Sequence, residues 1–554
     1  MNWLKNAFKS VGAAIPKQRR PMYIILLLIF SIYITTCIFF LIVDAGALPF
    51  FVITLIVFIA VMALLMLGTV KFKHFGFKLR KANGFSWRDF LRYFLLAAAV
   101  LLVFWFLKYP GITSPDTNYQ WEQATTFEIN DWHPALHTLF ISALAFVFRK
   151  YQFVLLFQNL VMAAGIAYLG AELKGLGFPK WAYRSSMLYI VLNPSTLSIM
   201  QYLWKDTAFG IAMLFFTVHL IDIFLSNGKW LLKPKNVVFF TLSFTAVSFM
   251  RHNGIFASFP ILIALLILYR GELLKRTLTV CCACVVTFLA IKFPIYSLLG
   301  VEQVEGQTYT ESVGLPMTIL CDNYMYARDT MPEDAAIMMS KLADEETWQQ
   351  NYTQGSYNSI KFYSNQEKVV GDTPLSELLA MTAECIEKNP YVSMRAVGTL
   401  LDMVYNPFAD VEWPPSWILT MNSPVNQELG VFGKIQAALS TVVRPIVQLT
   451  KYPPIKNFVW CVGMLMLLML FAAFFSFPRH GFKVFLLAGP MFIYNIGTML
   501  MLCGNDYRFF YFNIPIVLPV IFTLMTGGRA DRLKSVFYRL KTKVGSWGKK
   551  REKV

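Results

Sequence analysis

Charged residues are scarce in this chain of 554 residues: Asp, Glu, Lys and Arg together make up only 15% of it. Soluble domains carry roughly a quarter charged residues. Here 56% of the residues are hydrophobic and the mean hydropathy is +0.51. The shortage of charge excludes an ordinary soluble domain and predicts an all-α polytopic membrane protein.

Acidic residues are few outside one segment. Residues 301–455 hold 19 acidic and 9 basic residues, whereas the whole chain has a formal net charge of +18. The basic excess therefore lies elsewhere, in short loops and in the two terminal segments. This distribution is typical of a membrane topology with basic residues on the cytoplasmic side, and it argues against nucleic acid as a partner.

Cysteines and internal repeats are also sparse. The eight cysteines are scattered and mostly lie in apolar runs, such as residues 281–284, so we interpret them as small buried hydrophobic residues rather than metal ligands or disulfide partners. No strong internal repeat is visible, which weighs against an inverted-repeat transporter. No cleavable signal is evident, and the basic residues within 1–20 precede a full-length apolar segment that we interpret as a signal anchor.

About twelve apolar segments have the length or character of transmembrane helices, which need about 20 residues each. They occupy residues 22–43, 49–68, 93–108, 151–172, 184–203, 207–224, 237–252, 255–269, 277–299, 457–476, 484–503 and 509–526. With these twelve spans, the basic segments all fall on the cytoplasmic side, at residues 1–20, 71–92, 174–184, 229–235, 270–276, 479–483 and 529–554. Both termini are therefore expected in the cytoplasm of a multi-pass cell-membrane protein.

Residues 134–148 are apolar but only about 15 long. A crossing there would move three of the basic loops to the outside, so we expect an interfacial helix instead. The expected organisation is a transmembrane module at 1–299 with a first outer loop at 109–150. Next come a mostly helical extracytoplasmic domain at 300–456, transmembrane helices at 457–528, and a basic cytoplasmic tail at 529–554.

Polar residues near the helix ends gather on the outer side in this topology. Asp116 follows Ser114-Pro115 in the first outer loop. A loop aspartate beside a proline is often a turn former or helix cap. It is also suited to act as a general base on a hydroxyl group, or to bind a divalent cation. We therefore expect an outward-facing site that includes this residue.

Two histidines follow in the same loop region. His133 and His137 are four residues apart, at the start of a helix that begins near Pro134. This spacing is compatible with a metal pair, with a hydrogen-bonding role beside Asp116, or with structural packing. At the next outer turn, Lys205-Asp206 has two interpretations: an interfacial ion pair, or a lysine that binds a phosphate beside an aspartate that organises the site.

Arginines complete the set of candidates. Arg251 and His252 lie between two helices that are short for spans, so that an arginine is drawn toward the hydrocarbon, where such a residue usually has a partner or a function. A lipid phosphate would suit it. Arg251 is predicted to lie within reach of Lys205 or Arg508 across that phosphate, and its removal to weaken mainly donor binding. Arg508 has the same character, with an internal salt bridge to Asp506 as the alternative.

The order of these elements resembles the polytopic glycosyltransferases of the GT-C fold, which include protein O-mannosyltransferases and the aminoarabinose transferase of lipid A. The resemblance covers roughly residues 93–260, with a weaker match at 504–512. Its elements are Asp116 in the first outer loop, the His133-Pro134 pair, Lys205-Asp206 at the next outer turn, and Arg251. The chain departs from many of these glycosyltransferases at two positions. Thr117 follows Asp116 where they carry a second acidic residue, and Ala135 follows Pro134 where they carry a second proline.

The resemblance implies a polyprenyl-phosphate-linked sugar as donor, inverting transfer, and Asp116 as the base on the acceptor hydroxyl, with His133 beside it. Lys205, Asp206, Arg251, His252 and Arg508 would bind the substrate and its lipid phosphate. The acceptor is a cell-envelope glycan, a lipid or a protein, and membrane lipids surround the chain. No cofactor is assigned, and a divalent cation stays open, with Asp116, His133 and Asp206 as candidate ligands. A transporter or flippase of a lipid-linked or anionic solute is one alternative, and a polysaccharide polymerase or ligase is another.

Overall fold

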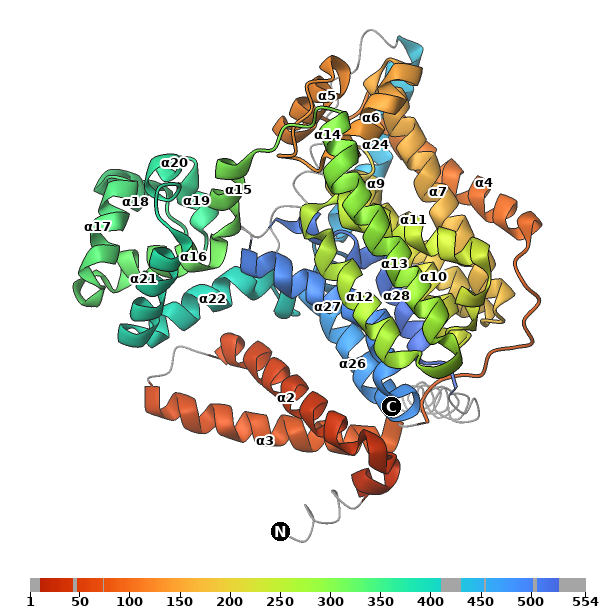
Figure 1. Ribbon diagram of the computed structural model, residues 1–554, viewed down its shortest axis with the longest axis horizontal. Helices are drawn as coiled ribbons and strands as arrows, with labels where there is room; N and C mark the ends of the chain where they lie inside the picture. The colour runs from red at the N-terminus through yellow and green to blue at the C-terminus, as the bar shows by residue number, and fades with distance from the viewer. Residues whose placement is uncertain are drawn as a thin grey trace, which may run out of the picture.

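The computed structural model describes residues 10–42, 47–72, 74–409, 430–452, 455–501 and 506–527. Throughout these ranges the regular elements are helices, and β-structure is limited to isolated bridges. The predicted all-α class is therefore confirmed. Figure 1 shows a large helical bundle, a smaller domain of short helices (α15 to α22) beside it, and a hairpin of two long helices, α2 (Arg20–Ile42) and α3 (Ala47–Phe72). The predicted basic tail at 529–554 lies outside the described residues.

Eight long apolar helical runs within the described residues could cross a membrane by length and composition. They are Lys17–Ile38, Val52–Phe72, Trp87–Leu107, Tyr151–Gly175, Lys205–Leu225, Leu274–Leu298, Val462–Met501 and Tyr507–Leu524. The run Val462–Met501 contains two helices, α26 (Val462–His480) and α27 (Val484–Met501), joined by a short turn. These runs fit a membrane-embedded protein, and the count of twelve crossings stays a prediction.

Three of the predicted spans, at 184–203, 237–252 and 255–269, are not among these eight runs. The segment predicted as one span at 184–203 is divided into α8 (Lys180–Leu192) and α9 (Pro194–Ile199). Asn193 caps α9 through its side chain and Pro194 is its first residue, so the preceding helix ends there. α11 (Pro234–Met250) and α12 (Ile255–Leu268) have only 17 and 14 residues. The expected short pair of helices around Arg251 is therefore present.

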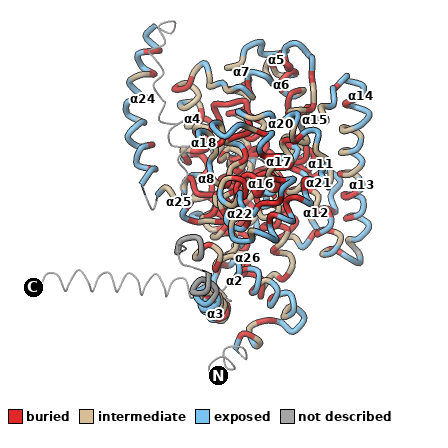
Figure 2. The backbone as a smooth tube through the Cα atoms, turned by 90° about the vertical axis from the view of Figure 1, so that its left-hand side faces the viewer, coloured by how far each residue is buried: buried red, intermediate tan, exposed pale blue. Residues whose placement is uncertain are grey.

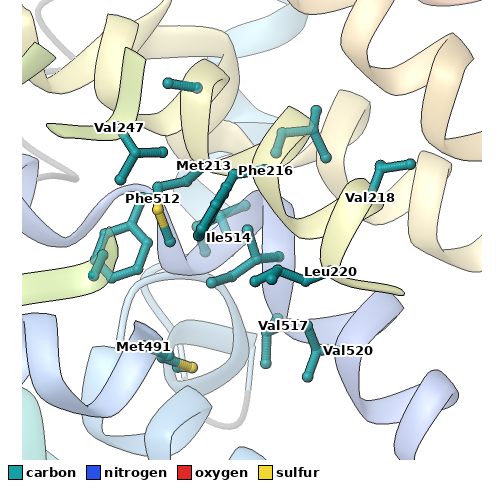
Figure 3. Packing of buried hydrophobic residues seen from close by; sticks show 14 of the residues in the cluster. Met213, Phe216, Val218, Leu220, Val247, Met491, Phe512, Ile514, Val517 and Val520 are labelled. Atoms are coloured by element: carbon teal, nitrogen blue, oxygen red, sulfur yellow. The ribbon is translucent and has the colours of Figure 1, made fainter. Parts of the chain in front are cut away.

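The bundle is organised around α10 (Lys205–Leu225). In an apolar stretch of 18 residues of this helix, 83% of the residues are buried, against 17% in a stretch of the same length from the run Leu274–Leu298. α10 packs against α7 (Tyr151–Gly175), α11, α27 and α28 (Asn513–Leu524), whereas α13 (Leu274–Ala290) lies at the edge of the bundle (Figure 2). Figure 3 shows part of this core, where Met213 and Phe216 of α10 meet Phe512 and Ile514. Because α10 is held on all sides, the residues at its first turn have a fixed position.

The helices between 305 and 405 form a separate domain with its own core. They are α15 (Glu305–Ser312), α16 (Gly314–Tyr326), α17 (Glu333–Leu342), α18 (Glu345–Asn351), α19 (Tyr357–Lys361), α20 (Gln366–Val369), α21 (Leu375–Lys388) and α22 (Pro390–Tyr405). Their buried residues extend from Val313 to Ala396 and include Trp348 and Tyr357, both with no exposed surface. The predicted helical character of this region is confirmed within the described residues.

The predicted 300–456 unit also contains a helix that does not pack on this domain. α24 (Val431–Leu449) lies instead against α4 (Trp87–Leu107), at the periphery of the molecule (Figure 2). The side chain of Gln436 donates hydrogen bonds to backbone carbonyls at the end of α4, those of Phe106 at 3.0 Å and Leu107 at 3.1 Å. The acidic segment of the sequence thus supplies two different parts of the structure.

Candidate functional site

Asp116 occupies the first turn of α5 (Pro115–Thr126), but it does not cap that helix. Ser114 is the cap residue: its hydroxyl accepts from the backbone N–H of Thr117, and the Thr117 hydroxyl accepts from the backbone N–H of Ser114. The carboxylate of Asp116 instead accepts from Nη1 of Arg508 at 2.7 Å. The helix-cap interpretation of Asp116 is therefore wrong, and its carboxylate is directed toward a charged partner from the other end of the chain.

Arg508 lies between two carboxylates. It belongs to a short 3-10 turn, Tyr507–Phe510, that is capped by Asp506. Oδ1 of Asp506 accepts from the backbone N–H of Arg508 at 3.0 Å, and Oδ2 of Asp506 pairs with its Nε at 2.8 Å. The alternative pairing with Asp506 is thus present together with the pairing to Asp116. Only 18% of the Arg508 side chain is exposed, so its position is closely defined.

Aromatic rings hold the two arginines near each other. The guanidinium carbon of Arg508 lies 5.1 Å from the ring of Trp204 and 5.2 Å from the ring of Phe509. The guanidinium of Arg251 lies over the same Phe509 ring at 4.5 Å. Trp204 is itself fixed by stacking on Tyr202, with ring centroids 3.9 Å apart. Such cation–π contacts allow an arginine to stay close to an apolar core without a full shell of water.

Arg251 also forms a buried ion pair with Asp206. The two side chains are 6% and 1% exposed. Arg251 ends α11 in an extended conformation, and Asp206 lies in the first turn of α10. A negative charge is favourable at the beginning of a helix, which places Asp206 well to receive the arginine. This ion pair is compatible with the organising role predicted for Asp206, which stays a prediction.

His133 and Lys205 form the third pair, in which Nζ of Lys205 lies 2.7 Å from Nδ1 of His133. Burial and the neighbouring positive charge of Lys205 lower the pKa of His133 well below its ordinary value. The imidazole is therefore neutral near pH 7, and Nδ1 accepts a hydrogen bond from the amino group of Lys205. His133 positions Lys205 instead of bonding to Asp116, and the hydrogen-bonding role predicted beside Asp116 is replaced by this one.

His137 and His252 lie next to this cluster and have other partners. Nε2 of His252 donates to the backbone carbonyl of Asp131 at 3.0 Å. Nδ1 of His137 lies 3.1 Å from the side-chain nitrogen of Gln120. His252 thus fixes the loop that carries His133, and His137 connects α5 to α6 (Ala135–Phe148). Among the alternatives for His137, the packing interpretation fits these contacts.

Lys292 is a residue of this region that sequence reasoning missed. Its ammonium pairs with Oδ2 of Asp131, while Oδ1 of Asp131 accepts from the backbone N–H of Ala135 at 2.9 Å. Lys292 lies in a π-helical turn, Ile291–Ile295, a type of turn that is frequent at functional sites. A single lysine inside the apolar segment 277–299 was the available signal, because an ionisable residue there usually has a partner.

Six of the seven residues predicted for the site are thus brought together, and the seventh, His252, contacts the loop that carries His133. Asp116 contacts Arg508, both arginines contact Phe509, Arg251 pairs with Asp206, and the neighbouring Lys205 is bonded to His133. The prediction that Arg251 lies near Arg508 agrees with this geometry. Three cationic side chains therefore gather beside one partly exposed carboxylate, that of Asp116, which is 31% exposed. Such a site can bind an anion with several negative oxygens next to a base.

The three predicted metal-ligand candidates do not share a centre. Asp116 pairs with Arg508, Asp206 pairs with Arg251, and His133 is bonded to Lys205. In the part of the chain that the structure describes, no group of three His, Cys, Asp or Glu side chains is arranged to hold a metal ion. The donor set is thus already matched to cations of the protein itself.

A family model matches residues 113–532 of this chain, which is more than half of it. The chain belongs to that family, a family of unknown function (DUF6020). No curated protein and no solved structure matches the chain. The matched region begins just before Asp116 and ends after Arg508, so it contains every residue of the candidate site.

The neutral His133 gives an expected pH dependence of stability. Its folded-state pKa lies below the unfolded value, so the folded chain is favoured above about pH 6.5 and loses stability as the pH falls below that value. The loss for this one group approaches about 1.4 kcal/mol per pH unit. We expect the thermal unfolding midpoint of the wild type to fall more steeply between pH 6.5 and 5 than that of His133→Asn. Equal slopes would contradict a buried neutral imidazole at this position.

Proposed function

We propose that this chain is a membrane glycosyltransferase of the GT-C type, which moves a sugar from a polyprenyl phosphate to a hydroxyl of a cell-envelope glycan, lipid or protein on the extracytoplasmic face. The observation that supports this proposal is the gathering of Lys205, Arg251 and Arg508 around Asp116. Arg251 pairs with Asp206 and Arg508 with both Asp116 and Asp506, whereas Lys205 is bonded to His133, so a phosphate would give the lysine an anionic partner and the arginines further oxygens. A bidentate guanidinium matches the oxygens of a phosphate well.

In the proposed reaction the acceptor oxygen forms a bond to the anomeric carbon as the bond from that carbon to the phosphate oxygen breaks. The sugar configuration is inverted, and polyprenyl phosphate leaves with the bonding electron pair. The acceptor proton passes to the carboxylate of Asp116. The extra negative charge on the departing phosphate is stabilised by Arg508, Arg251 and Lys205, whose preorganised donors cost little reorganisation when that charge develops.

The ion pair between Asp116 and Arg508 gives this scheme an order of events. A carboxylate that accepts from a guanidinium at 2.7 Å is a weaker base than a free one. A donor phosphate offers Arg508 more negative oxygens than Asp116 does, and Arg508 keeps its second partner, Asp506. Binding of the donor would therefore release Asp116 for the acceptor hydroxyl.

The first experiment is to measure binding of a polyprenyl phosphate by the full-length chain reconstituted in vesicles. We expect the phosphate lipid to raise the thermal unfolding midpoint, while the uncharged polyprenol, as the matched control, leaves it unchanged. The shift should be lost in Arg508→Gln. An equal response to both lipids would contradict a phosphate site, and a mass spectrum of the lipid that copurifies would identify the donor.

Two other functions remain distinguishable. A transporter or flippase predicts net movement of labelled lipid-linked sugar across the vesicle membrane with no transferred product. A polysaccharide polymerase or ligase would use a lipid diphosphate and would need no aspartate as base. The position of Asp116 beside the three cations favours the monophosphate transferase over both.

A further inference from the structure

α24 has three different faces along its length. Its buried residues follow a narrow stripe of small and polar side chains, Gly433, Gln436, Ser440, Val447 and, just after the helix, Thr450. The large apolar side chains point away from the protein: Val431, Ile435, Leu439, Val442, Ile446 and Leu449 are all 39–72% exposed. Since residues seven apart lie on one side of a helix, Lys434, Thr441 and Gln448 form a third, polar face.

The two ends of α24 fix its direction relative to the bundle. Near its start, Gln436 donates to carbonyls of residues 106, 107 and 109 at the end of α4, just before the loop that carries Asp116. Beyond its end, Thr450 accepts from Nε1 of Trp460 at 3.1 Å. Trp460 packs on Tyr507, the neighbour of Arg508, with ring centroids 5.6 Å apart. Both ends of α24 thus lie at the level of the candidate site.

A helix that crossed the membrane would have its ends at opposite faces of the bundle. Between Gln436 and Thr450 the chain rises by about 21 Å along the helix axis, yet both of these residues contact the same end of the bundle. α24 therefore runs along the rim. The helix it packs against, α4, also exposes large apolar side chains: Leu91, Leu95 and Val103 are 47–59% exposed.

The charged residues of α24 also indicate a position at a membrane surface. The helix carries the basic residues Lys434 and Arg444 and no acidic residue. An apolar face, a polar basic face and a weak overall hydropathy are the features of a helix that lies in the plane of a membrane interface. A water-soluble protein partner would have to cover the apolar face while leaving the neighbouring lipid-facing side of α4 in the bilayer.

We propose that α24 is an interfacial helix whose partner is the lipid bilayer. Val431, Ile435, Leu439, Val442, Ile446 and Leu449 enter its apolar layer, while Lys434, Thr441 and Gln448 face the headgroups and water. Through Gln436 this helix ties the membrane surface to the end of α4 and so sets the depth of the loop with Asp116. The inference rests on the contacts of α24 alone and does not depend on the proposed reaction.

Three pairs of adjacent residues allow a matched test. Lys434, Thr441 and Gln448 on the polar face precede Ile435, Val442 and Leu449 on the apolar face. Each would be replaced singly by cysteine in the full chain, with Cys503 and the exposed Cys282 changed to serine. The proteins would be reconstituted in vesicles of zwitterionic and anionic phospholipids. A membrane-impermeant maleimide would be supplied to both sides of the vesicles.

We expect the first residue of every pair to react at least about tenfold faster than the second, because an apolar environment suppresses the reactive thiolate. A crossing helix would instead protect both residues of the middle pair and leave both end pairs reactive, which would overturn the proposal. Equal reaction at all six positions would overturn it too, since the apolar face would then be in water. In detergent-free vesicles the three outcomes give three different patterns.

Discussion

Asp116→Asn is expected to abolish sugar transfer while leaving the chain folded. Asparagine keeps the shape of the side chain and an oxygen that can accept from Arg508, but it cannot take up the acceptor proton. Loss of a general base lowers turnover by about 10²- to 10⁴-fold. Because Arg508 would still be held by Asp506 at 2.8 Å, binding of polyprenyl phosphate should persist or become tighter. The effect should therefore fall on kcat and not on the KM for the donor.

Glu122→Gln is a matched control, since Glu122 is an exposed acid on the same helix, α5. It should transfer sugar at the wild-type rate. Transfer by Asp116→Asn at the wild-type rate, with a donor that the wild type uses, would end the assignment of Asp116 as base. A loss of donor binding in Asp116→Asn without a change in turnover would assign this residue to substrate binding instead.

The residues of this site could be selected from the sequence because polar side chains stand out among apolar helices. Asp116, Lys205 and Arg251 all lie where a helix begins or ends, and the charge pattern placed these positions on one side. Their pairings could not be predicted. Asp116 and Arg508 are 392 residues apart, and the sequence offers Arg508 a nearer partner in Asp506. Which carboxylate an arginine contacts depends on how α5, α10 and the 507–510 turn pack together.

Other features escaped prediction for a different reason. Lys292 stands alone among apolar residues in the sequence, which gives no sign of the π-helical turn that contains it or of its pairing with Asp131. The residues of α24 lie inside the acidic region 300–456 of the sequence, so they were assigned with the outer domain. The prediction at 184–203 failed as a single helix because total hydropathy does not register the break at Asn193-Pro194.

Arg251→Ala is expected to destabilise the chain strongly. The sequence alone predicted an effect mainly on donor binding, but the structure pairs Arg251 with Asp206, whose side chain is 1% exposed. Removing one partner of a buried ion pair leaves an uncompensated charge and costs about 3–5 kcal/mol. The free energy of unfolding, followed by thermal or denaturant unfolding of the reconstituted chain, should fall by about that amount. A loss of activity in this variant would therefore not reveal whether the arginine binds phosphate.

A double variant separates the two roles. Replacing a buried ion pair by apolar residues of similar volume is often neutral or stabilising, so Arg251→Met combined with Asp206→Leu should recover most of the lost stability. Its binding of polyprenyl phosphate should nevertheless be weaker than that of the wild type. In the wild type both Arg251 and Arg508 lie over the Phe509 ring, and the double variant keeps only Arg508 there. Full donor binding by a folded double variant would show that Arg251 serves the fold alone. If instead the double variant is as unstable as Arg251→Ala, the uncompensated charge of Asp206 is not the cause of the destabilisation.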